Sequence, residues 1–137
     1  MGRAHDEWVE EDTPVLVITF LLRRRADVSA EEFHTYWKDR HGPLVVSLAP
    51  TLGIRQYRQL HATDSPAGTA IAAGRGCAPT EWDGVALIWI DSEQALAEAV
   101  TTPEGAAAAA ALLEDERRFI DLARCEVFLS EDHTLIA

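Results

Sequence analysis

The chain has 137 residues, 47% of them hydrophobic and 26% charged, which is the length and composition of one globular domain. Its 23 acidic residues outnumber its 12 basic residues and give a formal net charge of −11. This negative charge argues against nucleic acid and against an anionic membrane surface as partners, because both attract basic protein surfaces.

The N-terminal segment is acidic and lacks the apolar core of a secretory signal. We expect residues 1–13 to form a flexible arm, followed by a single domain over residues 14–137. No apolar run is long enough to span a bilayer, and Cys77 and Cys125 have neither a metal-ligand spacing nor the pattern of a disulfide framework. The sequence therefore favours a cytoplasmic protein with free thiols.

Residues 15–22 form the first predicted strand. Because both the odd and the even positions carry apolar residues, we expect the strand to be covered on both faces. The triplet Arg23-Arg24-Arg25 follows directly. We interpret this triplet as a solvated strand end, with an anion-binding patch as the alternative.

A helix is predicted to start after Ser29, which suits an N-cap and has Glu32 at the spacing of a capping box. One face of this helix carries an aromatic stripe that ends in a histidine, made of Phe33, Tyr36, Trp37, Arg40, His41 and Leu44. Gly42 is expected to end the regular helix, and Pro43 is suited to open the next turn. His41 would therefore lie at the end of an apolar face, beside a fixed bend.

Residues 54–61 form the second predicted strand, in which Arg55, Tyr57, Gln59 and His61 share one face. Such a polar face suits one wall of a cavity, or else a solvated sheet face. Residues 62–83 are rich in Gly, Ala and Pro and have no useful periodicity, so we expect a long loop that gates the cavity.

Two further strands are predicted at residues 84–90 and 125–129. Between them, Asp91 or Ser92 should cap a short helix, and a longer helix should restart at Thr102 and run to about Leu122. The order β-α-β-β-α-β predicts an α+β, ferredoxin-like fold: an antiparallel four-stranded sheet with helices on one face. Since the first and third strands are apolar on both sides, the uncovered face needs a partner, and a twofold homodimer would supply it.

Several short motifs resemble those of the EthD-domain family. Residues 33–45 read F-x-x-Y-W-x-x-x-H-G-P-L-V, and the later motifs follow in order: Tyr57-x-Gln59-x-His61, Trp82-Asp83-Gly84, Asp115-Glu116 ahead of Phe119-Ile120-Asp121, and Glu131, Asp132 and His133. The resemblance implies a dimeric α/β barrel with a cavity in each subunit between sheet and helices. It also implies hydrophobic substrates, because EthD-like proteins occur in ether degradation and as decarboxylases or cyclising enzymes of polyketide pathways.

Three residues are the candidates for catalysis. His41 has an ordinary pKa near 6.5 that suits an acid or a base; the alternative is a structural histidine that holds the Gly-Pro bend. Tyr57 and His61 could hold a carbonyl or phenolate and move a proton. The candidates for substrate binding are Phe33, Tyr36, Trp37, Arg55, Gln59 and Trp89, with a core role as the alternative for the aromatic residues.

The resulting hypothesis is an enzyme of secondary metabolism or degradation that works without a cofactor or metal. It would act on an aromatic or polyketide-like molecule by proton transfer, as a lyase, isomerase or cyclase. The alternatives are a cofactor-free monooxygenase and a non-catalytic accessory protein that binds a small molecule. His34 and His41 lie on adjacent turns, but no third metal ligand has a recognisable spacing.

Overall fold

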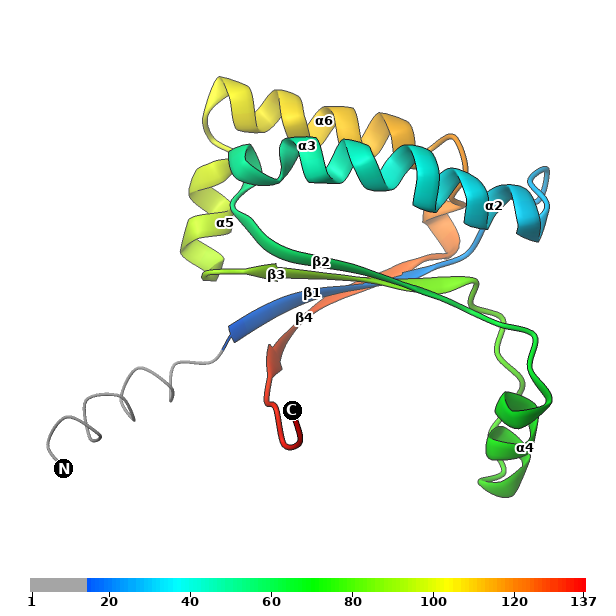
Figure 1. Ribbon diagram of the computed structural model, residues 1–137. Coiled ribbons are helices and arrows are strands. Elements are labelled where there is room, and N and C mark those ends of the chain that lie inside the picture. Colours follow the sequence, from blue (N-terminus) through cyan, green and yellow to red (C-terminus); the bar gives the residue numbers. More distant parts are fainter. Residues whose placement is uncertain (1–14) are drawn as a thin grey trace, which may run out of the picture.

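The computed structural model describes residues 15–137, so the predicted arm over residues 1–13 lies outside the described residues. Four strands form one antiparallel sheet in the order β2-β3-β1-β4: β1 (Val15–Leu22), β2 (Ile54–His61), β3 (Gly84–Ile90) and β4 (Glu126–Asp132). Helices α2, α3, α5 and α6 lie on one side of this sheet (Figure 1). The predicted α+β, ferredoxin-like fold is confirmed. Within the described residues no helix is both long and apolar enough to cross a membrane.

The first helical segment differs from the prediction at Gly42. Helix α2 (Ala30–Tyr36) begins with the expected capping box of Ser29 and Glu32, but it continues through a π-helical turn, Trp37–His41, directly into α3 (Gly42–Leu52). Pro43 has no N–H to donate to the carbonyl four residues earlier, and its ring would clash with that carbonyl in a regular helix. A wider turn before the proline relieves this conflict, so the glycine does not end the helix.

Helices α5 (Glu93–Ala99) and α6 (Pro103–Glu116) begin at the predicted caps, because the side chains of Ser92 and Thr102 accept backbone hydrogen bonds from Ala95 and Gly105. Helix α6 ends at Glu116, earlier than predicted, and a short 3₁₀ helix over Leu122–Arg124 leads into β4.

The hydrophobic core lies between the sheet and α2 with its π turn. Its fully buried side chains include Trp37, Phe33, Phe119 and Leu22, and Ala86 and Ile120 join the same cluster. The core therefore fixes the helix face that carries Phe33 and Trp37 against the centre of the sheet.

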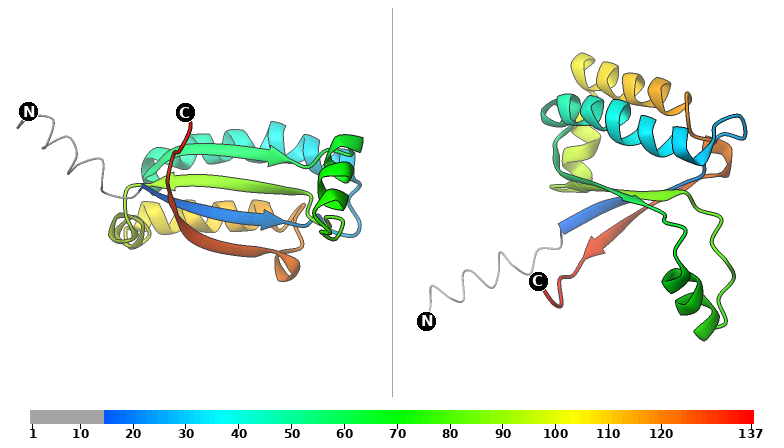
Figure 2. Two further views of the ribbon diagram at one scale, coloured as in Figure 1. Left: turned by 90° about the horizontal axis from the view of Figure 1, so that it is seen from below. Right: turned by 45° about the vertical axis from the view of Figure 1, so that its right-hand side comes forward.

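Residues 62–83 are not the featureless loop that the sequence predicted. Ser65 caps a helix, α4 (Pro66–Gly74), with its hydroxyl 3.2 Å from the backbone nitrogen of Ala67. This segment extends away from the end of β2 and β3, on the side of the sheet opposite the other helices (Figures 1 and 2).

The second face of the sheet carries no helix across its strands among the described residues (Figure 2, left). The strand register places Leu87 and Trp89 of β3 and Phe128 of β4 on this face, since their neighbours Ala86 and Ile88 face the helices. Phe128 is 51% exposed. The sheet therefore presents an apolar surface on its helix-free side.

Candidate functional site

A cavity of about 40 Å³ lies between the sheet and the helices that cover it. Phe20 and Ile88 of the sheet and Val45 and Leu112 of α3 and α6 are among the apolar side chains that line it. The titratable side chains in its wall are His41, Tyr57 and Glu116. The cavity thus brings together three groups that can exchange a proton in a mainly apolar environment.

His41 is held by a carboxylate that lies behind it. The His41 imidazole is buried, and its Nδ1 atom lies 2.7 Å from Oδ2 of Asp115 in α6. Burial lowers the pKa of His41, and the contact with Asp115 opposes this effect. The pKa of Asp115 is also lowered, because the hydrogen bonds from Tyr36 and His41 outweigh its partial burial. Near neutral pH, Asp115 is therefore ionised and accepts the Nδ1–H of neutral His41.

This contact determines which nitrogen of His41 is free. With the proton on Nδ1, the Nε2 atom carries a lone pair and can act as a base. Nε2 lies 3.9 Å from Oε2 of Glu116, which is too long for a hydrogen bond, so this nitrogen has no hydrogen-bond partner among the described residues. Asp115 therefore orients the imidazole in the way that a carboxylate orients the histidine of a hydrolase triad.

Glu116 is the carboxyl group of the cavity. Its burial and the negative charge of the adjacent Asp115 raise its pKa from 4.5 to about 7. A substantial fraction of Glu116 is therefore a neutral carboxylic acid near neutral pH, while the neighbouring His41 is a neutral base. Because the pKa of the carboxyl group is raised and that of the imidazole is lowered, Glu116 is suited to act as the acid and His41 as the base.

Tyr36 supports Asp115 from the opposite side. The phenol of Tyr36 donates to Oδ1 of Asp115 at 2.5 Å, and the guanidinium of Arg118 lies 3.7 Å from the same oxygen. Tyr36 therefore holds the carboxylate that orients His41, and it does not line the cavity itself.

Tyr57 belongs to a second chain of hydrogen bonds. The amide nitrogen of Gln59 lies 2.8 Å from both the Tyr57 hydroxyl and the carbonyl oxygen of Trp37. The Gln59 oxygen lies 2.8 Å from Nε2 of His61, and Nδ1 of His61 lies 2.7 Å from Nδ1 of His34. Four side chains are thus connected from the cavity toward α2.

The Trp37 carbonyl fixes the direction of this chain, since a carbonyl only accepts and the Gln59 amide nitrogen must donate to it. The Gln59 oxygen then accepts from Nε2–H of His61, and a neutral His61 accepts at Nδ1 from His34. Tyr57 accepts from Gln59 and keeps its own proton free for an acceptor in the cavity. Burial raises the pKa of Tyr57, so the phenol remains protonated near neutral pH.

The structure brings His41, Tyr57 and Trp37 into the cavity wall and places Gln59 and His61 next to it. His61 does not line the cavity; it packs against Trp37 of the cavity wall, with ring centroids 4.3 Å apart, and lies within hydrogen-bond distance of Gln59. Phe33 is fully buried in the core.

Two predicted binding residues lie elsewhere. The pairing of β2 with β3 is irregular between Ile54 and Gln56, so Arg55 is the extra residue of a β-bulge and forms an ion pair with Asp91. The expectation that Arg55 shares the face of Tyr57 is wrong, and Ile54 takes the place in the cavity wall. Trp89 lies on the helix-free face and donates to Asp132 at 2.8 Å.

Sequence reasoning assigned no role to Asp115 and Glu116, although both stand in the motifs quoted for the family. One signal was available: Ala108, Leu112 and Glu116 follow each other at a spacing of four, which places the glutamate on the inward face of α6. The segment 62–83 was expected to gate the cavity, and none of its residues lines the cavity. Within residues 15–137, no group of three or more His, Cys, Asp and Glu side chains could hold a metal ion.

Solved structures with the same fold are distant in sequence. An ethyl tert-butyl ether (EthD) family protein from Bacillus halodurans is 17% identical, with a TM-score of 0.58 over 87% of this chain and 99% of that chain. A dimeric ferredoxin-like protein of unknown function from Bacteroides fragilis is 14% identical, with a TM-score of 0.55 over 86% and 96% of the two chains. An EthD-like protein from Ralstonia eutropha is 16% identical, with a TM-score of 0.53 over 90% and 94%.

A comparison with curated proteins finds no match. The family model of the EthD domain matches residues 25–123, a range that includes both the π turn with its buried His41 and the carboxylates of α6. The match covers well over half of the chain. The protein therefore belongs to the EthD-domain family.

Proposed function

We propose that this protein is an enzyme that transfers a proton within a small hydrophobic molecule. One observation supports the proposal above the others: a buried histidine with a free Nε2 faces a carboxyl group of pKa about 7 across 3.9 Å, inside an apolar cavity. His41 would remove a proton from carbon or oxygen of the substrate. Glu116 would deliver a proton at another atom, so that the substrate rearranges without net gain or loss of electrons.

The hydroxyl of Tyr57 defines the chemistry of the substrate. Because Gln59 donates to this hydroxyl, the Tyr57 proton points to an acceptor, and a carbonyl or phenolate oxygen would take it. An aromatic or polyketide-like ketone fits both this donor and the apolar wall. Decarboxylation, dehydration, isomerisation and cyclisation of such a molecule all depend on proton transfer next to a carbonyl group.

The cavity must enlarge to admit this substrate. Its volume of about 40 Å³ is small, whereas typical ligand pockets measure roughly 300–1,000 Å³. We infer that side chains of the covering helices, among them Val45 and Leu112, move when a substrate enters. In the closed state the cavity offers room for one or a few water molecules.

We also propose that the protein is a homodimer joined through the helix-free faces of two sheets. Support comes from the apolar side chains on this face, of which Leu60 and Phe128 are about half exposed. The Bacteroides fragilis protein of the same fold is described as dimeric. Burial of this face against a second copy would remove the apolar surface from water.

The proposed reaction can be tested without knowledge of the natural substrate. Small aromatic ketones and β-keto acids of graded size would be incubated with the protein in D₂O, and NMR would follow exchange of C–H for C–D and loss of the carboxyl group. The wild-type protein should catalyse one of these changes with saturation. His41→Gln should lose about 10²–10⁴-fold in rate while it stays folded.

Glu116→Gln should also reduce the rate, and Glu114→Gln, on an exposed position of the same helix, should leave it unchanged. Equal rates in the wild type and His41→Gln would refute the proposal. Probes that bind to the wild type without any exchange would refute it as well and would indicate a binding protein.

A further inference from the structure

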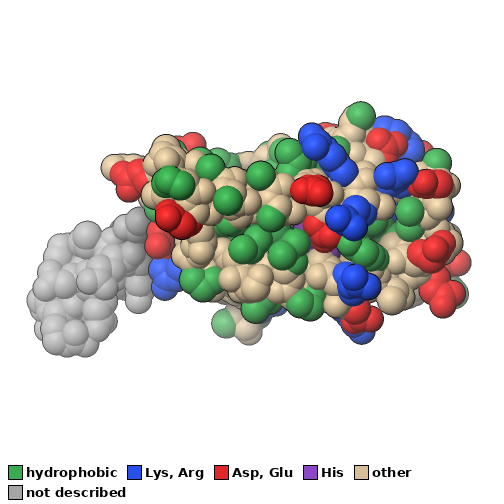
Figure 3. Space-filling view, turned by 90° about the horizontal axis from the view of Figure 1, so that it is seen from above, with side chains coloured by type: hydrophobic (Ala, Val, Ile, Leu, Met, Phe, Trp, Pro, Cys, Tyr) green, Lys and Arg blue, Asp and Glu red, His purple; other side chains and the backbone are tan. Residues whose placement is uncertain are grey.

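Arginine side chains gather at one end of this acidic protein. Arg23, Arg24, Arg25 and Arg124 line an open pocket of about 300 Å³ together with Glu81 and Asp83. The pocket lies where β1 ends. At this point residues 23–25 pair with the segment that follows α6, and the backbone N–H of Asp121 donates to the carbonyl oxygen of Arg23. Basic side chains also gather over the α2 end of the molecule when it is seen from the helix side (Figure 3, right).

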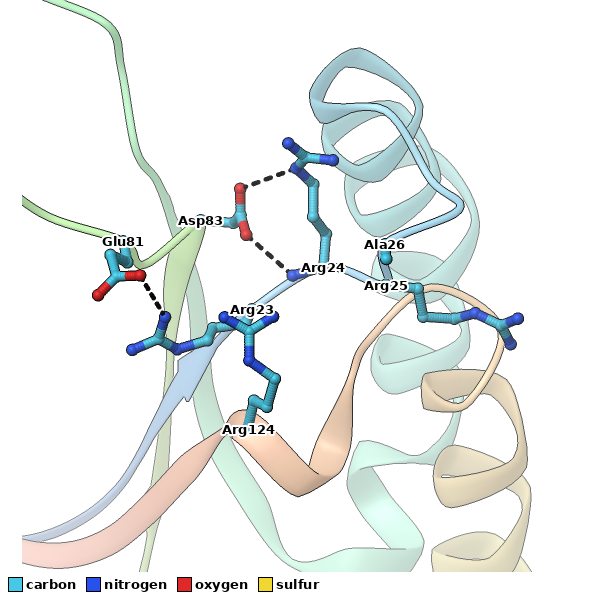
Figure 4. A pocket seen from close by; sticks show the side chains of 7 residues that line it. All are labelled: Arg23, Arg24, Arg25, Ala26, Glu81, Asp83 and Arg124. Atoms are coloured by element: carbon cyan, nitrogen blue, oxygen red, sulfur yellow. Dashed lines mark hydrogen bonds and ion pairs between the residues drawn. The ribbon is translucent and has the colours of Figure 1, made fainter.

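Two of these arginines donate side-chain hydrogen bonds within the protein. Arg24 contacts Asp83 with its Nε atom at 3.3 Å and donates from Nη1 to the carbonyl oxygen of Val28 at 2.5 Å. Arg25 makes a bidentate contact with Asp27, at 2.9 and 2.8 Å, and its side chain extends away from the pocket (Figure 4). These two guanidinium groups stabilise the local fold, and Arg25 has all three of its nitrogens engaged, since Nη1 also donates to the carbonyl oxygen of Arg117.

The other two arginines are not engaged in this way. Nη1 of Arg23 lies 3.4 Å from Glu81, and Nη1 of Arg124 lies 3.7 Å from Asp121, whereas charge-assisted hydrogen bonds measure about 2.7–2.9 Å. Within the described residues, neither guanidinium donates a hydrogen bond to a protein acceptor. Their N–H groups are therefore available, and the side chain of Arg124 extends from the 3₁₀ helix toward Arg23 (Figure 4).

Arg23 is also held in position. Its side chain is only 20% exposed, and its guanidinium carbon lies 4.2 Å from the centre of the Trp82 ring. Contact with the face of an indole stabilises a cation, and it restricts the side chain without using its N–H groups. The guanidinium of Arg23 is thus held in place with N–H groups that face the open pocket, so an anionic ligand could accept from them without a rearrangement of the side chain.

We propose that Arg23 and Arg124 form a binding site for a small oxyanion, a phosphate or a carboxylate group. A planar guanidinium with several N–H groups matches the oxygens of both ligands. Glu81 occupies the site in part, since its carboxylate is the nearest acceptor to Arg23 and its side chain is 75% exposed. A bound anion would take the place of this carboxylate. The site does not depend on the reaction proposed for the cavity.

Titration with inorganic phosphate and with acetate, in buffer that contains only chloride, tests the site. The indole N–H of Trp82 serves as the NMR signal, because its ring lies against Arg23. Binding should saturate at millimolar concentrations. Arg124→Gln, an exposed position that the fold does not require, should weaken it about tenfold or more. Arg23→Gln should do the same, and Arg75→Gln is the matched control outside the pocket.

Glu81→Gln should bind the anion more tightly than the wild type, because the internal competitor has lost its charge. Phenyl phosphate distinguishes a free ion from an anionic group on a larger molecule. If phenyl phosphate binds more tightly than inorganic phosphate, the site takes an anionic group on a larger molecule. If the two bind equally, the site takes the free ion. The proposal is overturned if no saturation occurs, or if Arg124→Gln binds phosphate as the wild type does.

Discussion

Gly84 lies directly beneath the indole of Trp37, and a Cβ atom built on this glycine would meet Cζ3 of Trp37 at 2.4 Å. It would also lie 2.7 Å from the carbonyl oxygen of Leu60 on the neighbouring strand. The absence of a side chain at residue 84 thus allows the largest core side chain to rest on the strand backbone. Trp37 in turn forms part of the cavity wall next to His41.

Gly84→Ala should therefore lower the free energy of unfolding by about 1–3 kcal/mol, as overpacking of a core does. Urea unfolding followed by circular dichroism measures this change. Gly68→Ala is the control, since a Cβ there meets nothing within 4 Å and alanine favours the interior of α4. An unchanged stability in Gly84→Ala would show that the indole does not pack against this strand.

Glu116 should make stability depend on pH in a direction that is unusual for a carboxyl group. Its pKa in the folded protein is about 7, above the value of 4.5 that applies when it is exposed. Between these values the folded state binds more protons than the unfolded state, so the contribution of Glu116 to stability falls as pH rises from 4.5 through 7. Because glutamine does not ionise, the variant Glu116→Gln should not lose stability in this way as the pH rises.

The free energy of unfolding of Glu116→Gln, relative to the wild type, should therefore increase by on the order of 2 kcal/mol between pH 5 and pH 8. Urea unfolding at both pH values gives the comparison, with Glu114→Gln as the control on the same helix. If the difference between Glu116→Gln and wild type stays constant with pH, Glu116 ionises like an exposed carboxyl group.

The hydrogen-bond directions in the site predict the tautomers of three histidines. When the three rings are neutral, His41 should carry its proton on Nδ1, His61 on Nε2 and His34 on Nδ1. The ¹⁵N chemical shifts of the ring nitrogens distinguish the tautomers directly.

Gln59→Leu should remove the preference of His61 for the tautomer with its proton on Nε2, because the Gln59 oxygen accepts that proton. The tautomer of His41 should not change. His133, which is exposed, serves as the reference. A proton on Nδ1 of His61 in the wild type would mean that the hydrogen bonds from His34 to Tyr57 do not run in the assigned direction. Tyr57 would then lose its assigned role as a donor to the cavity.

The proposed dimer predicts opposite results for two charge substitutions. Phe128→Asp places a carboxylate on the helix-free sheet face and should convert the dimer to a monomer at micromolar concentration in light scattering. Val46→Asp changes an exposed apolar residue on α3, on the opposite side of the sheet, and should leave the dimer intact. A monomeric wild type, or a dimer that is lost only with Val46→Asp, would place the interface elsewhere or exclude it.

The parts of the fold that sequence alone predicted are those with local causes. Ser29, Ser92 and Thr102 mark helix starts through hydrogen bonds that reach only three residues, so their effect can be read without knowledge of the tertiary structure. The same rule was available for α4, since Ser65 and Pro66 are a helix start. The glycines that follow, among them Gly68 and Gly74, are poor helix formers and weaken the helical pattern.

The features that sequence did not predict depend on contacts between distant segments. The bulge at Arg55 is a feature of the pairing between β2 and β3, and the residues of β2 alone do not reveal this register. Asp115 acquires its role from His41, 74 residues earlier in the chain. A carboxylate on the inward side of an alanine-rich helix has no visible partner until the helices are packed together.

The π turn at Trp37–His41 keeps one line of side chains in phase with the sheet. Phe33, Trp37, His41 and Val45 are spaced by four residues, and in a regular helix of 3.6 residues per turn each step would rotate the next side chain about 40° further from the first. One wider turn cancels part of this rotation, so all four are buried. The helix loses its regular hydrogen bonding at this one turn. As a result the ring of His41 points into the cavity, whereas a regular helix would turn it partly toward solvent.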